Sequence, residues 1–218
     1  MKRLTNFMCL ALLCAAIGCN DATTKTDESI QSKPDSPSTT VADQTPTVQD
    51  SAAMMKAWQE YMTPGEMHAM LAKDNGVWNA EVTMWMSPDA PPQKSTGVAT
   101  NKMILGGRYQ QATFKGNFNG MPFEGLSTLA YDNSKKKFVN TWIDNMGTGI
   151  MTMEGTYDAA TKTINFEGSS TDPTTGKECK MREIFKPVDE NTQVMEMYAT
   201  YPGGKEYKSM EITYKRKK

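Results

Sequence analysis

The chain has 218 residues, with 24 Lys and Arg against 25 Asp and Glu, and a single histidine, His68. Charges this evenly balanced provide no basic field for nucleic acid, so we expect no nucleic-acid partner. One histidine, placed ahead of the predicted strands, gives no basis for a Ser-His-Asp triad or a multi-histidine metal site, and no P-loop, Gly-x-Ser-x-Gly or dinucleotide-binding motif occurs. We therefore assign no catalytic residue, no metal ligand and no cofactor.

Residues 1–18 have the pattern of a bacterial lipoprotein signal peptide. The basic start Met1-Lys2-Arg3 precedes an apolar run from Leu4 to Ile17, which is too short and wrongly flanked for a transmembrane helix. The run ends in Ala16-Ile17-Gly18-Cys19, which is similar to a lipobox and implies a lipidated Cys19, with palmitate among the acyl groups, that anchors the protein to a membrane. An ordinary cleaved signal peptide with an incidental cysteine is the alternative.

Residues 19–50 are predicted to be the lipidated cysteine and a disordered acidic tether. From Asn20 to Asp50 there are six acids, two lysines and no aromatic residue. Such a segment buries too little apolar surface to offset the entropy of ordering it. Asn20, rather than aspartate, follows Cys19, and we expect a lipid-anchored protein of the bacterial cell envelope, at the outer membrane or its periplasmic face.

Residues 51–76 are predicted to be a helix or a helix pair. Apolar side chains recur there at helical spacing, three and four residues apart: Met54, Met55, Trp58, Tyr61 and Met62. In Thr63-Pro64-Gly65-Glu66 we expect Thr63 to be the N-cap of a second helical piece and Glu66 to complete a capping box. Met67, Met70 and Leu71 continue the apolar stripe until Asn75-Gly76 ends it.

Residues 77–218 are predicted to form an all-β domain. Ten strand-like runs alternate with turn signals such as Gly106-Gly107 and Asn119-Gly120. They begin near Val77, Gln93, Arg108, Met121, Lys137, Gly149, Thr163, Lys177, Thr192 and Lys205. Strands joined by tight turns make an antiparallel meander, and ten of them are too many for one unprotected sheet, so we expect closure into a β-barrel.

Methionine and aromatic residues share one face of several of these strands. Because methionine is flexible and polarizable, the pattern favours a pliable interior for an apolar small molecule, and a core packed with methionine is the alternative. The candidates for ligand contact are Trp78, Met84, Arg108, Trp142, Met151, Met153, Met195, Met197 and Tyr214. Three Met-x-Met pairs, 84/86, 151/153 and 195/197, also suit Cu(I), although any strand with two inward methionines shows the same spacing.

Other reactive groups form no recognisable constellation. Cys179 is the one thiol after Cys19 and has no neighbouring histidine, so we interpret it as a buried, inert side chain. Nothing in the sequence pairs Glu154, Glu183 and Glu196 across strands. If the protein is an enzyme, Arg108, Glu154 and Trp142 are the residues we expect to line a cavity. His68 as a haem ligand requires its helix to cap the barrel mouth, and a partly exposed helix histidine is the simpler interpretation.

Residues 67–216 resemble the bacterial domain of unknown function 1579 family. The match includes Thr141–Thr163, Gly106-Gly107-Arg108, Phe123-Glu124-Gly125 and the C-terminal KEYKSMEITYKRK. The resemblance implies a lipocalin-like, calycin-type barrel. Gly76-Val77-Trp78 is similar to the Gly-x-Trp of lipocalins, which implies that Trp78 packs at the closed end against Arg216 or Lys215. The barrel also resembles the nitrobindin type, whose haem-binding histidine lies on a late strand, but this chain has no histidine after His68.

The sequence thus favours a non-enzymatic, membrane-tethered, lipocalin-like barrel that binds or carries an apolar small molecule. The alternative is a structural or protein-interaction module of the envelope with a packed interior, for which an apolar patch outside the barrel would be evidence. An enzyme is the third possibility.

Overall fold

The computed structural model describes residues 48–218, with side chains from residue 50. The predicted signal peptide, Cys19 and the predicted tether up to residue 47 lie outside the described residues. Two helices, α1 (Val48–Met62) and α2 (Glu66–Ala72), precede the strands. Neither of these described helices is long and apolar enough to span a lipid bilayer.

The break between the helices differs from the predicted one. Thr63 does not cap α2: its hydroxyl donates to the carbonyl of Gln59 and so closes α1. Helical backbone is disfavoured at the residue before Pro64 because the proline ring crowds it. The N-cap of α2 is Gly65, whose N–H donates to Nδ1 of His68 at 3.1 Å. The predicted capping box with Thr63 and Glu66 is therefore wrong.

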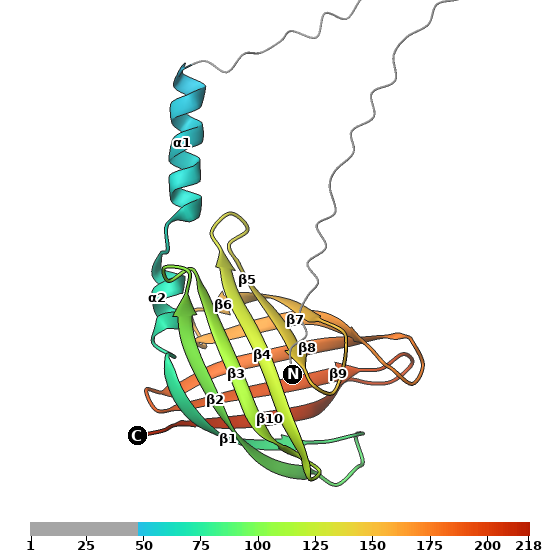
Figure 1. Cartoon of the computed structure of the whole chain (residues 1–218). Coiled ribbons are helices and arrows are strands. Elements are labelled where there is room, and N and C mark those ends of the chain that lie inside the picture. Colours follow the sequence, from blue (N-terminus) through green and yellow to red (C-terminus); the bar gives the residue numbers. More distant parts are fainter. Residues whose placement is uncertain (1–47) are drawn as a thin grey trace, which may run out of the picture. The chain divides into compact units, whose positions relative to one another are not determined.

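Ten antiparallel strands form a closed barrel, as predicted (Figure 1), and each begins within two residues of its predicted start. Consecutive strands pair along the chain, and β1 pairs with β10 to close the ring. The strands are β1 (Gly76–Met84), β2 (Gln93–Ile104), β3 (Tyr109–Phe118), β4 (Met121–Asp132), β5 (Lys137–Asp144), β6 (Met151–Asp158), β7 (Thr163–Thr171), β8 (Glu178–Asp189), β9 (Thr192–Thr200) and β10 (Tyr207–Arg216).

Tight turns account for the unbroken meander. Asn119 and Gly120, between β3 and β4, both have positive φ angles, 51° and 84°, as a two-residue type I′ hairpin requires. Gly106 and Gly107, between β2 and β3, adopt φ angles of 68° and 82° that residues with a Cβ rarely take. The sequence signals for both turns are confirmed.

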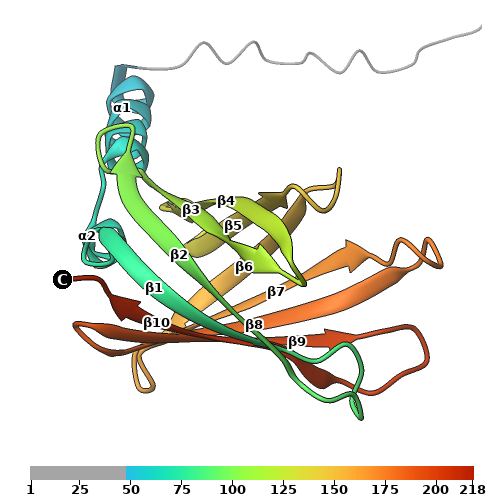
Figure 2. The same cartoon turned by 60° about the horizontal axis from the view of Figure 1, so that its bottom comes forward.

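The two ends of the barrel differ. α2 lies at the end where β1 begins and β10 finishes (Figure 2). At this covered end, the inward-facing Leu71, Phe138, Ile164 and Phe166 are almost fully buried. The opposite end carries no helix among residues 48–218, and we call it the open end because several of its inward-facing side chains, such as Met84, Trp142 and Met151, are only half-buried.

Candidate functional site

The covered end is locked by Trp78 and Arg216. The Trp78 ring is completely buried, and the Arg216 guanidinium lies 4.1 Å from the ring centroid. Arg216 also donates hydrogen bonds to the backbone carbonyls of Lys73, Asn75 and Glu190. The predicted packing of Trp78 against a basic residue of the last strand is confirmed, and the partner is Arg216. Lys215 points outward and pairs with Glu81.

Polar side chains fasten the loop after α2 to the barrel. Nε1 of Trp78 donates to the Asp74 carbonyl at 2.9 Å, and Nε2 of Gln110 donates to the Leu71 carbonyl at 2.7 Å. Nε2 of Gln193 donates to the Asp74 carboxylate at 2.6 Å. Burial raises the pKa of Asp74 to about 6, although the bond from Gln193 and the charge of Arg216 act in the opposite direction. These contacts make this end of the barrel a structural closure.

The open end presents a methionine-rich and aromatic inner surface. Phe123 and Trp142 stack with their ring centroids 6.4 Å apart, and Nε1 of Trp142 donates to Asp144 at 2.8 Å. Trp142 lies over Gly125 so closely that a Cβ on this glycine would be 2.1 Å from the indole. The half-buried apolar side chains that pack against the core here are Met84, Phe123, Trp142, Met151, Met181 and Met210. Phe185 and Tyr214 belong to the same cluster but lie closer to the covered end, where they pair with Ile164 and Gln193.

Glu183 brings a carboxylate to this apolar interior. Strand pairing sets it opposite Phe166 and Met197, which are both inward-facing, and it is 8% exposed. Burial raises the pKa of its carboxyl to about 7. No hydrogen bond or ion pair reaches Glu183 from residues 48–218, and no buried side-chain oxygen of the described chain is both sealed from solvent and unpaired. Its oxygens therefore face space that water can enter.

The phenol of Tyr214 also points inward. Burial, and next the negative charge of Glu183, raise the pKa of Tyr214. Within the described residues, its hydroxyl has no hydrogen-bond partner either. Two polar groups that have no hydrogen-bond partner in the described part of the chain therefore lie within electrostatic reach of each other inside the barrel.

The predicted ligand-contact residues fall into four groups. Met84, Trp142, Met151 and Tyr214 face inward and are half-buried, whereas Met153, Met195 and Met197 face inward and are buried in the core. Trp78 belongs to the covered end. Arg108 is exposed and lies outside the barrel interior. In the first of the three Met-x-Met pairs, Met86 lies beyond the end of β1 and is 60% exposed.

Sequence reasoning did not select Glu183 as a site residue, although the signal was present. It falls in the alternating series of Cys179, Met181 and Phe185, whose side chains share the inner face of β8. An acid at an inward position between two apolar residues is unusual because its charge loses water on folding. That contrast could have identified it.

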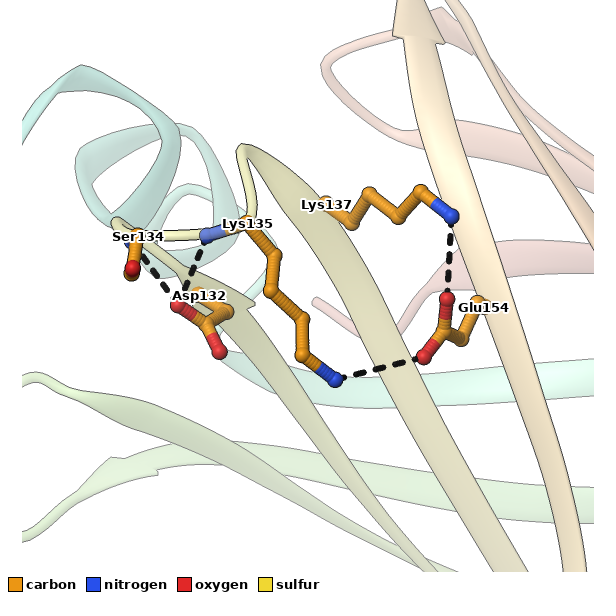
Figure 3. Close-up of polar contacts among 5 residues, drawn as sticks. All are labelled: Asp132, Ser134, Lys135, Lys137 and Glu154. Carbon is orange, nitrogen blue, oxygen red and sulfur yellow. Dashed lines mark hydrogen bonds and ion pairs between the residues drawn. The ribbon is translucent and has the colours of Figure 1, made fainter. Parts of the chain in front are cut away.

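The three residues considered for an enzyme do not meet. Trp142 is inside the barrel and Arg108 is outside it. Glu154 lies on the outer face of β6, paired with Lys135 at 3.5 Å and Lys137 at 3.0 Å (Figure 3). These lysines hold the pKa of Glu154 below its usual value. The trio therefore does not line a common cavity, and Glu196, bonded to Lys208 on the outer face, does not pair with Glu183 either.

A separate concave site lies beside the covered end. This cleft of about 300 Å³ is formed between the end of α1, α2 and the neighbouring ends of β3, β4 and β5. Asn133, in the β4–β5 turn, bonds there to backbone carbonyls at the end of α1. The cleft is lined by Tyr61, Met62, His68, Arg108, Tyr109, Ala130, Tyr131, Asp132, Asn133 and Val139.

His68 is buried in the wall of this cleft, so the expectation of a partly exposed helix histidine is wrong. It is 5% exposed, and its Nδ1 accepts the N–H of Gly65. Burial lowers its pKa, a hydrogen bond with the Tyr131 backbone opposes that effect, and the charge of Arg108 lowers it further. His68 is thus a neutral structural residue that caps α2, on the helix that covers the end opposite the open one.

The remaining thiol is also structural. Cys179 is 2% exposed, and burial raises its pKa, which suppresses the reactive thiolate. Among residues 48–218, no group of three or more His, Cys, Asp or Glu side chains is arranged to hold a metal ion.

Fold and inner surface together define a lipocalin-like meander barrel, closed at one end by a tryptophan–arginine pair. The chain belongs to the family described as "Protein of unknown function (DUF1579)", whose model matches residues 63–216. A search of curated protein sequences found no match.

Two solved structures share the fold. The S-type phycobiliprotein lyase CPES from Guillardia theta is 9% identical, with a TM-score of 0.53 over 74% of this chain and 97% of that chain. Rv2717c from M. tuberculosis is 14% identical, with a TM-score of 0.55 over 72% of this chain and 100% of that chain. At these identities the similarity establishes the barrel fold alone.

Proposed function

We propose that this protein is a membrane-anchored, lipocalin-like protein of the bacterial cell envelope that binds an apolar small molecule inside its barrel. The observation that carries the proposal is the half-buried methionine and aromatic surface of the open end. A packed core would bury those side chains, whereas adaptable apolar walls with a few polar groups are typical of small-molecule sites. The fold shared with a phycobiliprotein lyase is compatible with such a role.

Binding of a neutral apolar fluorophore, N-phenyl-1-naphthylamine, tests the proposal. We expect saturable binding to the full chain that Met151→Gln weakens at least fivefold, because Met151 faces the interior near the open end. Met146→Gln is the matched control, since Met146 is 50% exposed in the β5–β6 turn. No saturable binding, or equal weakening by both variants, would contradict an interior site.

The membrane anchor is a separate part of the proposal and rests on the lipobox-like sequence at Cys19. In cells fed a palmitate analogue, the wild-type chain should carry the label and fractionate with membranes, whereas a Cys19→Ser chain should lose both properties. Equal labelling of the two chains would refute lipidation at Cys19.

A second candidate function is a protein-interaction module of the envelope. It is favoured by the exposed apolar face of α1, formed by Met54, Met55, Trp58, Tyr61 and Met62, which are between 46% and 71% exposed. An exposed apolar face of this kind is a common feature of helices that bind a partner protein. Cross-linking in intact cells should give one defined partner that Trp58→Gln abolishes and Lys56→Gln, on the opposite side of α1, leaves unchanged. A cross-link that persists in both variants would refute this role for α1.

A further inference from the structure

We propose that Glu183, with Tyr214 within electrostatic reach, is a headgroup site deep in the barrel, and that the ligand is an amphiphile whose polar end is a protonated amine. This inference rests on the proposed binding of an apolar molecule and adds the chemistry of the ligand's polar end.

The geometry places both groups on the same side of the interior. Glu183 lies on β8 opposite Met197 of β9, and Tyr214 lies on β10 opposite Gln193 of β9. The two residues therefore lie on strands separated by β9 and four residues apart along it, about 13 Å at the usual rise per residue. Both face the interior, and the charge of Glu183 acts on the phenol of Tyr214. An ammonium group can donate to the Glu183 carboxylate and keep further N–H donors for water.

Neither group has a hydrogen-bond partner among residues 48–218. Glu183 is more than nine-tenths buried, and within residues 48–218 nothing donates to its carboxylate, although water can reach its oxygens. A buried carboxylate without a partner is costly, and native proteins seldom keep one without a compensating contact. A bound cation supplies both the missing charge and the missing hydrogen bonds.

The inner face of the barrel does not suit a negatively charged headgroup. Among the inward-facing residues of the ten strands, Arg216 is the one basic residue, and its guanidinium is occupied by Trp78 and three backbone carbonyls at the covered end. A fatty acid or another anionic amphiphile would thus place its charge beside Glu183 without a compensating cation.

The inner face of β8 gives the apolar part of the ligand a surface that runs toward the open end. From Glu183, the inner face of β8 continues through Met181 to Cys179, a strand length of about 13 Å at the usual rise per residue. Met181, Met151 and Met210 contribute apolar surface at that end. A single alkyl chain with an amine at its inner end matches this arrangement.

Three probes with one alkyl chain test the headgroup: dodecylamine, dodecanol and dodecanoate, each below its micelle concentration, titrated by calorimetry at pH 8. The protein is the full chain with Cys19→Ser, so that no lipid anchor competes for the probes. We expect dodecylamine to bind at least tenfold more tightly than dodecanoate, with dodecanol between them.

Glu183→Gln should weaken dodecylamine at least tenfold while changing dodecanol less than threefold, and Tyr214→Phe should weaken dodecylamine less than Glu183→Gln does. Glu167→Gln, which removes an exposed acid from the outer face of β7, is the charge-matched control and should change nothing. Circular dichroism should show all variants folded, because glutamine is isosteric with glutamate and carries no charge to bury.

The outcomes separate the two proposals. Equal affinity for the three probes, or Glu183→Gln without effect on dodecylamine, overturns the headgroup site and leaves the binding of apolar molecules intact. Failure of every probe to bind the wild-type barrel overturns both.

Discussion

At the scale of single residues, the buried carboxylate of Glu183 makes the free energy of unfolding depend on pH. Its pKa is about 7 in the folded chain against 4.5 for an unperturbed glutamate. Because folding raises this pKa, the protonated carboxyl makes its full contribution to the free energy of unfolding below pH 4.5. That contribution is lost as the pH rises through 7. The loss amounts to roughly 2–3 kcal/mol above pH 8.

We therefore expect Glu183→Gln to be more stable than the wild type by roughly 2 kcal/mol at pH 8.5 and nearly equal to it at pH 4.5. Urea unfolding at the two pH values measures the difference. Asp74, whose pKa is also raised, titrates in both proteins and cancels in the comparison. A stability difference that stays constant with pH, or that grows toward acid, would contradict the burial of this charge.

Arg216 is the second residue with a large expected effect. Arg216→Met removes a cation from the Trp78 ring and three hydrogen bonds to backbone carbonyls. We expect a loss of about 2–4 kcal/mol in the free energy of unfolding. Lys215→Met, which removes an exposed ion pair with Glu81, is the neighbouring control and should cost less than about 1 kcal/mol. Similar losses for both variants would argue against the closure of this end by Arg216.

At the scale of elements, α1 is tied to the barrel through Asn133. Its side-chain amide lies 3.2 Å, 3.1 Å and 2.8 Å from the carbonyls of Glu60, Tyr61 and Thr63. Since one amide has two hydrogens, it satisfies at most two of the free carbonyls at the helix end at a time.

Asn133→Ala should speed amide hydrogen exchange in α1 at least tenfold while leaving exchange in β4 and β5 unchanged, because the barrel keeps its own hydrogen bonds. Ser134→Ala, in the same turn, is the control, because it is the backbone N–H of Ser134 that bonds to Asp132 (Figure 3). Unchanged exchange in α1 would mean that other contacts position the helix.

The local elements were largely predictable from the sequence, and the contacts between distant elements were not. Period-two alternation and the Asn119-Gly120 turn are encoded within a few residues, so the ten strands follow from neighbouring positions. The burial of His68 and the exposure of Arg108 depend on how α2 packs against β2, β3 and β4, which local spacing does not determine.

At the scale of the whole molecule, the two ends of the barrel differ in role: the covered end is a structural closure, and the open end carries the proposed binding surface. Its covered end is sealed by Trp78, Arg216 and α2, so a ligand of the proposed interior site would have to enter from the opposite end. There the wall is half-buried methionine and aromatic surface, with Glu183 and Tyr214 deeper inside. The central claim is that this interior holds an apolar molecule.

Native mass spectrometry of the protein purified from its own host membranes, followed by solvent extraction, tests that claim most directly. We predict a bound species of defined mass that is released by extraction and is depleted in Met151→Gln but retained in Met146→Gln. A wild-type protein that carries no such species and takes up no apolar probe would contradict the account.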